Sequence, residues 1–402
     1  MAKVLPFKGI LPDKQLAEKI VTQSADNYTI EQAKEIVQKN PLSYLSVIYP
    51  DFIDNQKTPP HSLERFNKIY NRFQYLKNNH YFQQDKQSAY YIYKQKHKEF
   101  EFNGIIAAIS TDDYFNGSIK IHEQTLSERE KKLKEYLRHC KINAEPVLFF
   151  HPDNQIVSDI IFNIQNNTSH LNISLHDVEY FVWKSFDVEK NLVIQRYFEE
   201  IGSVYIADGH HRSASSSLLA KELKDNPNAQ YFLGAFFPEN NLKIYSFHRL
   251  ITQVNIPSNF IEKLSEHFYV KEISQPHYDL KEKTIGMYWN NKRFLLTYKN
   301  KEDKSIDTEI LYQYILKPVF NLEDIRNNPF VHYYPEYTCT TSQAEEMVNN
   351  KKYQLAFFTH PLSVQHIKET ALQNQIMPPK STYVLPKLLN ALVIYSLENS
   401  ME

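Results

Sequence analysis

The chain has 402 residues and a formal net charge of −1, with 42% hydrophobic and 23% charged residues. This composition is typical of a folded globular protein that is long enough for two or three domains, and it excludes a disordered chain. The near-neutral charge argues against attraction to nucleic acid or to an anionic membrane, so neither is expected as a partner.

Glycine is scarce and widely scattered, because there are only 7 glycines and no two lie closer than 7 residues. Loops that cradle nucleotide phosphates usually contain several glycines within a few positions. The spacing allows neither the dinucleotide-binding pattern G-x-G-x-x-G nor the P-loop pattern. Rossmann dinucleotide binders, P-loop NTPases and protein-kinase glycine loops are therefore excluded.

The predicted location is the cytoplasm. The two cysteines, Cys140 and Cys339, form no metal-ligand pattern, and a reducing compartment is the simplest interpretation. The first residues contain no apolar signal segment, and no run approaches the ~18 apolar residues that a membrane-spanning helix needs.

Hydrophobic periodicity and turn signals predict elements that alternate between helix and strand. Capping boxes at Thr29 with Gln32 and at Ser127 with Glu130 mark two helix starts. The predicted helices cover residues 14–22, 30–39, 63–78, 127–139, a segment after 212, and 341–350. The predicted strands cover 42–49, 88–95, 104–110, 145–151, 192–198, 203–207, 229–238, 242–250, 293–299 and 390–397, with a loop at 111–117.

This alternation predicts an α/β or α+β fold. We expect an N-terminal α/β region over residues 1–103, a central core over 104–255 and a C-terminal α/β region over 256–402 that packs on the core.

Residues 204–212, VYIADGHHR, contain the densest group of chemically versatile side chains. An apolar strand ends at Asp208, and a helix rich in Ser and Ala follows the two histidines and Arg212. The free N–H groups at a helix start favour an anion, and an arginine can bind phosphate oxygens with two of its N–H groups. His210 and His211 could donate hydrogen bonds or carry a proton, and Asp208 could hold Mg²⁺. The alternative is a polar turn whose histidines only cap the helix.

A second group lies in KIHEQT, residues 120–125. Glu123 beside a phosphate-binding turn is a candidate general base for a hydroxyl nucleophile, and Lys120 could neutralise charge on the transferred group. His122 and Thr125 are candidates for nucleotide contact, as Ser213 is on the first turn of the following helix. The alternative for the glutamate is a surface acid near a helix start.

Two further motifs have two interpretations each. The segment 377–387, MPPKSTYVLPK, is rigid, basic and rich in hydroxyl groups, so it could bind phosphate or anchor the C-terminal part of the chain. His248 and Arg249 repeat a His-Arg pair at the end of a predicted strand and are interpreted as a contact between elements. The histidines and acids lack the spacing of a zinc site, which favours a Mg²⁺ ion brought by a nucleotide.

Together these motifs resemble the bacterial domain-of-unknown-function family 1015. The resemblance runs in order along the chain through PFKGILP (6–12), KNPLSYLSVIYPD (39–51), KIHEQT (120–125), YIADGHHR (205–212), FHRL (247–250) and PPKSTYVLPK (378–387). One departure is residues 22–28, TQSADNY, where family members often have a P-P-Y-D-type segment.

The D-G-H-H-R turn is also similar to that of the ParB/sulfiredoxin-like superfamily and, within it, of the free serine kinases, which phosphorylate L-serine. This resemblance implies a ParB/sulfiredoxin-like nucleotide-binding core. It places Asp208, Gly209, His210, His211 and Arg212 at the nucleotide phosphates, and it makes Glu123 the candidate base.

The expected function is therefore that of a small-molecule kinase. It would transfer phosphate from ATP or ADP, with Mg²⁺, to the hydroxyl of a free amino acid, L-serine by preference. Asp208 and His210 join Glu123 as candidate catalytic residues. The alternatives are a non-catalytic nucleotide-binding regulatory protein and a phosphohydrolase, and the oligomeric state stays open, a homodimer included.

Overall fold

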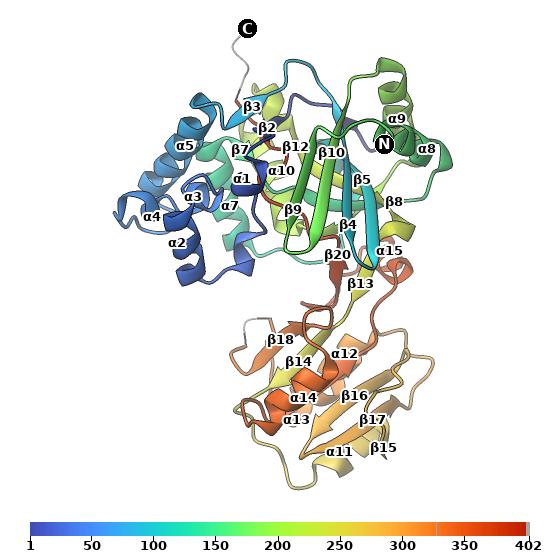
Figure 1. The fold of residues 1–402 in the computed structure, drawn as a ribbon. Coiled ribbons are helices and arrows are strands. Elements are labelled where there is room, and N and C mark those ends of the chain that lie inside the picture. The colour runs from blue at the N-terminus through green and yellow to red at the C-terminus, as the bar shows by residue number, and fades with distance from the viewer. Residues whose placement is uncertain (327, 399–402) are drawn as a thin grey trace. The chain divides into compact units, whose positions relative to one another are not determined.

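The computed structural model describes residues 1–326 and 328–398, which divide into two compact units (Figure 1). Unit 1 comprises Met1–Leu242 and the segment that begins at Pro386, and unit 2 comprises Lys243–Leu385. This division differs from the three ranges expected from sequence. Strand β5 crosses the boundary expected after residue 103, and it pairs with β4, which lies before that boundary. The first two expected ranges therefore share one sheet.

A large mixed sheet organises unit 1, with strand order β6-β11-β8-β12-β5-β4-β10-β9 and with β1 paired to β5. The pairs β6 with β11 and β8 with β12 are parallel, and the other pairs are antiparallel. The strands of the unit are β1 Val4–Leu5, β2 Ile10–Pro12, β3 Phe82–Gln84, β4 Tyr90–His97, β5 Phe100–Ser110, β6 Ile119–Lys120, β7 Ile142–Asn143, β8 Val147–His151, β9 Leu171–Leu175, β10 Val178–Ser185, β11 Val204–Asp208, β12 Tyr231–Pro238 and β21 Tyr395–Ser396.

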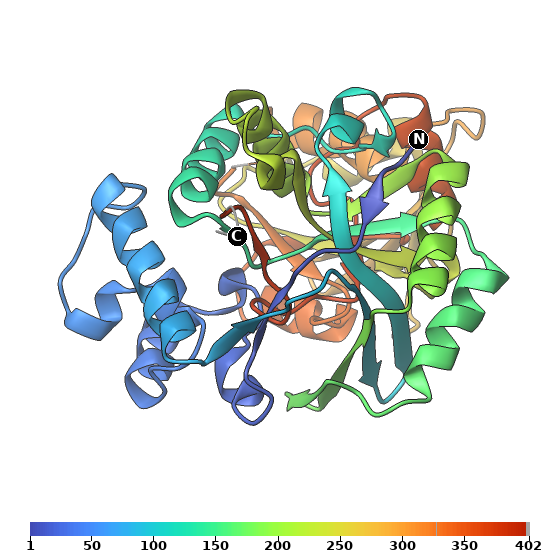
Figure 2. The same ribbon diagram turned by 90° about the horizontal axis from the view of Figure 1, so that it is seen from above.

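The helices of unit 1 form two groups, which are seen from two directions in Figures 1 and 2. Helices α8 and α9 pack on the large sheet through Ile161, Ile194 and Phe198, whereas α3 and α5 share a separate core with the end of α7. The helices are α1 Ala17–Ile20, α2 Ile30–Lys39, α3 Leu45–Ile48, α4 Asp51–Asp54, α5 Leu63–Asn78, α6 Asp112–Phe115, α7 Ser127–Cys140, α8 Gln155–Gln165, α9 Val188–Ile201 and α10 His210–Glu222, with 3₁₀ turns η1 Ala25–Asn27, η2 Pro227–Gln230 and η3 Glu239–Asn241.

Unit 2 is built on an antiparallel sheet with strand order β15-β17-β16-β19-β14-β18, and β13 pairs with β20 separately. Its elements are β13 Lys243–Tyr245, β14 Phe247–Ile251, α11 Phe260–His267, β15 Phe268–Ile273, β16 Thr284–Trp289, β17 Lys292–Tyr298, α12 Asp307–Leu311, a π-helical turn Tyr312–Leu316, α13 Lys317–Phe320, β18 Val331–Pro335, α14 Thr341–Asn349, β19 Leu355–Thr359, α15 Val364–Leu372 and β20 Tyr383–Leu385. The expected mixed α/β class is confirmed in both units.

The predicted helices at 30–39 and 63–78 are confirmed, and their local causes are visible. Thr29 accepts from the backbone N–H of Gln32, and the Gln32 side chain accepts in return from the N–H of Thr29, which completes the predicted capping box. Helix α5 buries Phe66, Ile69 and Phe73 at the spacing of one helical face.

The strand predicted at 192–198 is wrong, because these residues lie inside helix α9. The helix begins four residues earlier than the predicted strand, where the side chain of Asp187 accepts from the N–H of Lys190. Its buried residues Ile194, Tyr197 and Phe198 have helical spacing, and Gly202 ends it with a φ of 70°. The apolar run was ambiguous until the cap upstream was included.

Four other expectations need correction. Residues 42–49 contain the short helix α3 instead of a strand, and α6 lies within the loop predicted at 111–117. The capping box at Ser127 does not form, because the carboxylate of Glu130 accepts from the Thr125 hydroxyl and Leu126 is the N-cap. Of the strand predicted at 390–397, only β21 forms, since Ile394 and Asn390 make isolated bridges.

Replacing Asp187 by alanine is expected to lower the free energy of unfolding by about 1 kcal/mol, because the first turn of α9 loses its side-chain cap. Urea unfolding monitored by circular dichroism measures the change. Asp187→Asn, which keeps an equally good cap, should unfold at nearly the wild-type urea concentration. Equal loss in both variants would show that the cap contributes nothing.

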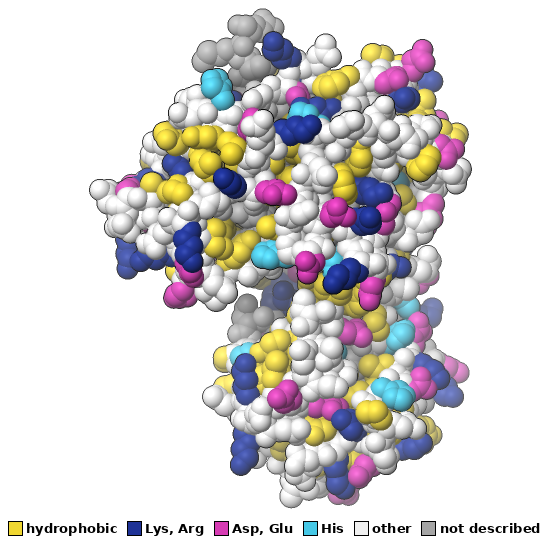
Figure 3. All heavy atoms as spheres, in the orientation of Figure 1, with side chains coloured by type: hydrophobic (Ala, Val, Ile, Leu, Met, Phe, Trp, Pro, Cys, Tyr) yellow, Lys and Arg dark blue, Asp and Glu magenta, His cyan; other side chains and the backbone are white. Residues whose placement is uncertain are grey.

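No helix among residues 1–326 and 328–398 combines the length and the apolar character that a membrane crossing needs. On the face shown in Figure 3, Lys and Arg side chains are interspersed with Asp and Glu in each unit, in line with the net charge of −1.

Candidate functional site

The turn between β11 and α10 is the centre of the candidate site. Asp208 ends the strand, Gly209 adopts a φ of 104°, and His210 begins the helix. A left-handed conformation favours glycine, and a Cβ atom at this position would lie only 2.9 Å from Nη2 of Arg212. The turn therefore places the free N–H groups of a long helix and an arginine side chain together, which suits an anion.

Strand β6 brings the second motif to this turn. Lys120 on β6 pairs in parallel register with Tyr205 on β11, so the residues after Lys120 run beside the start of α10. The rings of His122 and His210 meet edge to face, with centroids 4.5 Å apart, and the N–H of His122 points to Nε2 of His210 at 3.5 Å. The structure thus joins two motifs that are more than 80 residues apart in sequence.

The two histidine rings are buried and neutral at pH 7. Their side chains are only 3% and 4% exposed, and burial lowers the pKa of His122 to about 4 and that of His210 well below its ordinary value. With Nε2 of His210 accepting, its single ring proton lies on Nδ1. Nδ1 lies 3.7 Å from a carboxylate oxygen of Glu123, which is longer than a hydrogen bond. The neutral ring of His210 is therefore a close neighbour of Glu123 and carries no charge that would pair with it.

Two cations flank Asp208. The ammonium group of Lys387 lies 2.9 Å from one carboxylate oxygen, and the guanidinium of Arg212 lies 3.7 Å from the other. Burial raises the pKa of Asp208, but Lys387 and Arg212 outweigh it and hold that pKa well below the ordinary value. Arg212 also contacts Glu145 at 2.5 Å. Two positive side chains are thereby fixed beside the helix N-terminus.

The other predicted residues lie close to this centre in different roles. His211 accepts from the backbone N–H of Leu126 at 3.1 Å, which ties α10 to the start of α7. Thr125 donates to Glu130, so its hydroxyl is part of the α7 N-terminus. Ser213 is fully buried on α10, and its hydroxyl makes no hydrogen bond to any residue that the structure describes.

Asp208 does not fit a Mg²⁺ ion held by protein ligands. Its carboxylate already lies between two cations, and the described residues contain no group of three or more His, Cys, Asp or Glu placed to hold a metal ion. Any Mg²⁺ at this turn would therefore be coordinated mainly by the oxygens of a bound nucleotide.

Sequence reasoning missed the roles of Glu145 and Lys387 at this turn. Lys387 belongs to the motif at 377–387, whose purpose was open, and the structure shows that it contacts Asp208 from 179 residues away. The available signal was a lysine that follows Pro386 in a basic, proline-containing motif. Glu145 gave no signal, because it stands alone before a strand.

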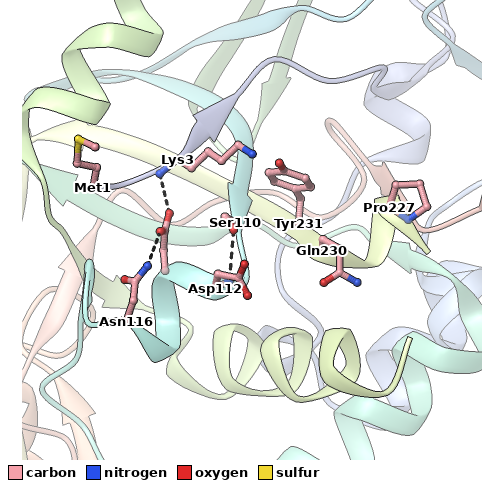
Figure 4. A pocket seen from close by; sticks show the side chains of 9 residues that line it. Met1, Lys3, Ser110, Asp112, Asn116, Pro227, Gln230 and Tyr231 are labelled. Atoms are coloured by element: carbon pink, nitrogen blue, oxygen red, sulfur yellow. Dashed lines mark hydrogen bonds between the residues drawn. The ribbon is translucent and has the colours of Figure 1, made fainter. Parts of the chain in front are cut away.

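A separate hollow of about 530 Å³ lies at the end of β5, lined by Lys3, Ser110, Asp112 and Tyr231 among others (Figure 4). Asp113 accepts from the N–H of Lys3 and from the side chain of Asn116 there. None of the predicted site residues lines this hollow.

The fold and the site define a mixed α/β protein in which Arg212 and Lys387 lie beside the turn from β11 to α10. The family model described as "Protein of unknown function (DUF1015)" matches residues 4–319, and the chain belongs to this family. No curated protein matches the chain.

Solved structures with some similarity include kinases and a protein without assigned function. A "Free serine kinase in complex with AMP" has 14% identity and a TM-score of 0.41 over 72% of this chain and 91% of that chain. A variant of a free serine kinase in complex with ADP has 12% identity and a TM-score of 0.40 over the same shares. A conserved hypothetical protein from Pyrococcus furiosus has 13% identity and a TM-score of 0.38, over 73% of this chain and 95% of that chain.

Proposed function

We propose that this protein is a small-molecule kinase, which transfers the terminal phosphate of ATP or ADP to the hydroxyl of a free amino acid, L-serine by preference. The observation that supports it most is the meeting of the two motifs. A helix N-terminus with Arg212 and Lys387 stands near the carboxylate of Glu123, which lies 3.7 Å from Nδ1 of His210.

Each part of this arrangement has a chemical task in phosphoryl transfer. The N–H groups at the start of α10 and the guanidinium of Arg212 bind phosphate oxygens and stabilise the charge of the transferred group. The serine hydroxyl oxygen bonds to the terminal phosphorus while the bond from phosphorus to the bridging oxygen breaks. The hydroxyl proton passes to Glu123, and ADP or AMP leaves. Asp208 keeps Lys387 and Arg212 in place.

The test is incubation of the protein with ATP or ADP labelled in the terminal phosphate, Mg²⁺ and a panel of free amino acids. Labelled O-phosphoserine is the expected product, with less or none from threonine and none from alanine. Labelled inorganic phosphate in all samples would indicate a hydrolase instead. Tight nucleotide binding without any transfer would indicate a regulatory protein.

Gly209→Ala is expected to weaken nucleotide binding about 10-fold, because the added methyl group displaces the Arg212 guanidinium. Gly117→Ala is a matched control, since Gly117 also has a positive φ, of 80°, but a Cβ there meets nothing within 4 Å. Both variants should lose about 1 kcal/mol of stability from backbone strain. Isothermal titration with the nucleotide measures affinity, and equal affinity in both variants would contradict the role given to Arg212.

A further inference from the structure

A large apolar cavity lies in unit 1, and Arg212 is among the residues that line it. Its volume is about 990 Å³, which is at the upper end of small-molecule pockets. Its walls are formed by Ile48 and Phe52 from α3 and α4, Phe66 and Ile69 from α5, and Leu133 and Leu137 from α7. A free serine would leave most of this space unfilled, so the cavity suits a larger and apolar molecule.

Two buried polar atoms in the lining of the cavity have no hydrogen-bond partner among residues 1–326 and 328–398. Ser216 and Asn390 both line it and are only 5% and 4% exposed, yet Oγ of Ser216 and Oδ1 of Asn390 make no hydrogen bond to any described residue. Buried polar atoms without partners are costly in a folded protein. A polar atom of a bound molecule could form a hydrogen bond with either of them.

The rim of the cavity carries an excess of positive charge. Lys34, Lys57, Arg129 and Lys132 line it, are exposed, and have no carboxylate within 4 Å among residues 1–326 and 328–398. The acids of the lining are engaged, because Asp51 contacts Arg65 and Lys68, Glu128 contacts Lys131, and Glu145 contacts Arg212. A negative group at the mouth of the cavity would therefore meet cations that are not already paired with a carboxylate of the described chain.

We propose that this cavity binds an amphipathic carboxylic acid. The apolar body of the ligand fills the space between α5 and α7, its carboxylate lies at the rim near Arg129 and Lys132, and a polar substituent faces Ser216 and Asn390. Burial of the apolar body provides most of the affinity, and the charged rim selects an anion over a neutral or cationic molecule of equal length. The proposal does not depend on the phosphotransfer proposed above.

The test compares three probes of equal length, decanoate, 1-decanol and decylammonium, by isothermal titration of the full chain without nucleotide at pH 7.5. We expect decanoate to bind at least about 10-fold more tightly than either of the others. Equal binding of decanoate and decanol would overturn the proposal, as would tighter binding of decylammonium or no binding of any probe.

Substitutions of residues that line the cavity test whether decanoate binds there. The double substitution Arg129→Glu with Lys132→Glu is expected to weaken decanoate binding about 10-fold and to leave decanol binding unchanged. Lys224→Glu is the control for a change of charge, because Lys224 is exposed and does not line the cavity. Leu133→Asp should place a negative charge in the apolar wall and weaken decanoate binding about 10-fold or more. Because Leu133 is half-exposed, urea unfolding should show a folded variant. Unchanged decanoate binding in the double variant or in folded Leu133→Asp would overturn the assignment to this cavity.

Discussion

Replacing Glu123 by glutamine is expected to lower the rate of phosphotransfer to L-serine by about 10²–10⁴-fold, which is the usual contribution of a positioned proton acceptor. The amide has the size of the carboxylate but cannot accept the hydroxyl proton. Nucleotide affinity should stay the same or rise, because a negative group beside the phosphates is removed. Initial rates from labelled nucleotide and affinities from titration separate the two effects.

Glu128→Gln is the control for this result, because Glu128 is an exposed acid on the first turn of α7 and, among residues 1–326 and 328–398, forms an ion pair only with Lys131. It should keep the wild-type rate. A Glu123→Gln variant with a wild-type rate would show that Glu123 is not the base, and hydrolysis that continues without transfer would favour the phosphohydrolase alternative.

The second large effect concerns stability and pH. His122 has a pKa of about 4 in the folded protein, lowered by burial from the ordinary 6.5. Between pH 6.5 and about pH 4, His122 is therefore protonated in the unfolded chain and neutral in the folded protein. The folded state loses stability as the pH falls through this range, by about 3 kcal/mol in total for this ring. Above pH 6.5 the contribution is fully present.

Urea unfolding at pH 7.5, 6.0 and 5.0 measures this dependence. The variant His122→Gln should lose less stability between pH 7.5 and 5.0 than the wild type, by about 1.4 kcal/mol for each pH unit below the ordinary pKa. His80→Gln is the control, because His80 is exposed and should leave the pH dependence unchanged. Parallel pH curves for His122→Gln and the wild type would contradict the burial of a neutral ring.

Local signals predicted much of the fold. The capping box at Thr29 and the apolar spacing of α5 act within a few residues, so the sequence alone was sufficient for both helices. The segment at 192–198 shows the limit, since its apolar run fits a strand equally well and only the cap at Asp187 and the packing of Ile194 on the sheet select a helix. Tertiary contacts of this kind cannot be predicted from the pattern of a few neighbouring residues.

The candidate site divides in the same way. Glu123 and Arg212 were recognisable because each lies in a dense polar motif next to an apolar strand. Their proximity depends on the parallel pairing of β6 with β11, which no local pattern predicts. The neutral state of His210 and the contact of Lys387 with Asp208 depend on burial and on a chain segment 179 residues away. The unpaired rim of the cavity likewise becomes visible only in three dimensions.

A crystal structure with a bound nucleotide tests the central claim most directly. The terminal phosphate is predicted to contact the N–H groups at the start of α10 and the guanidinium of Arg212, with the carboxylate of Glu123 facing it across the turn. A nucleotide bound elsewhere, or phosphates that avoid the turn at residues 208–212, would contradict the account.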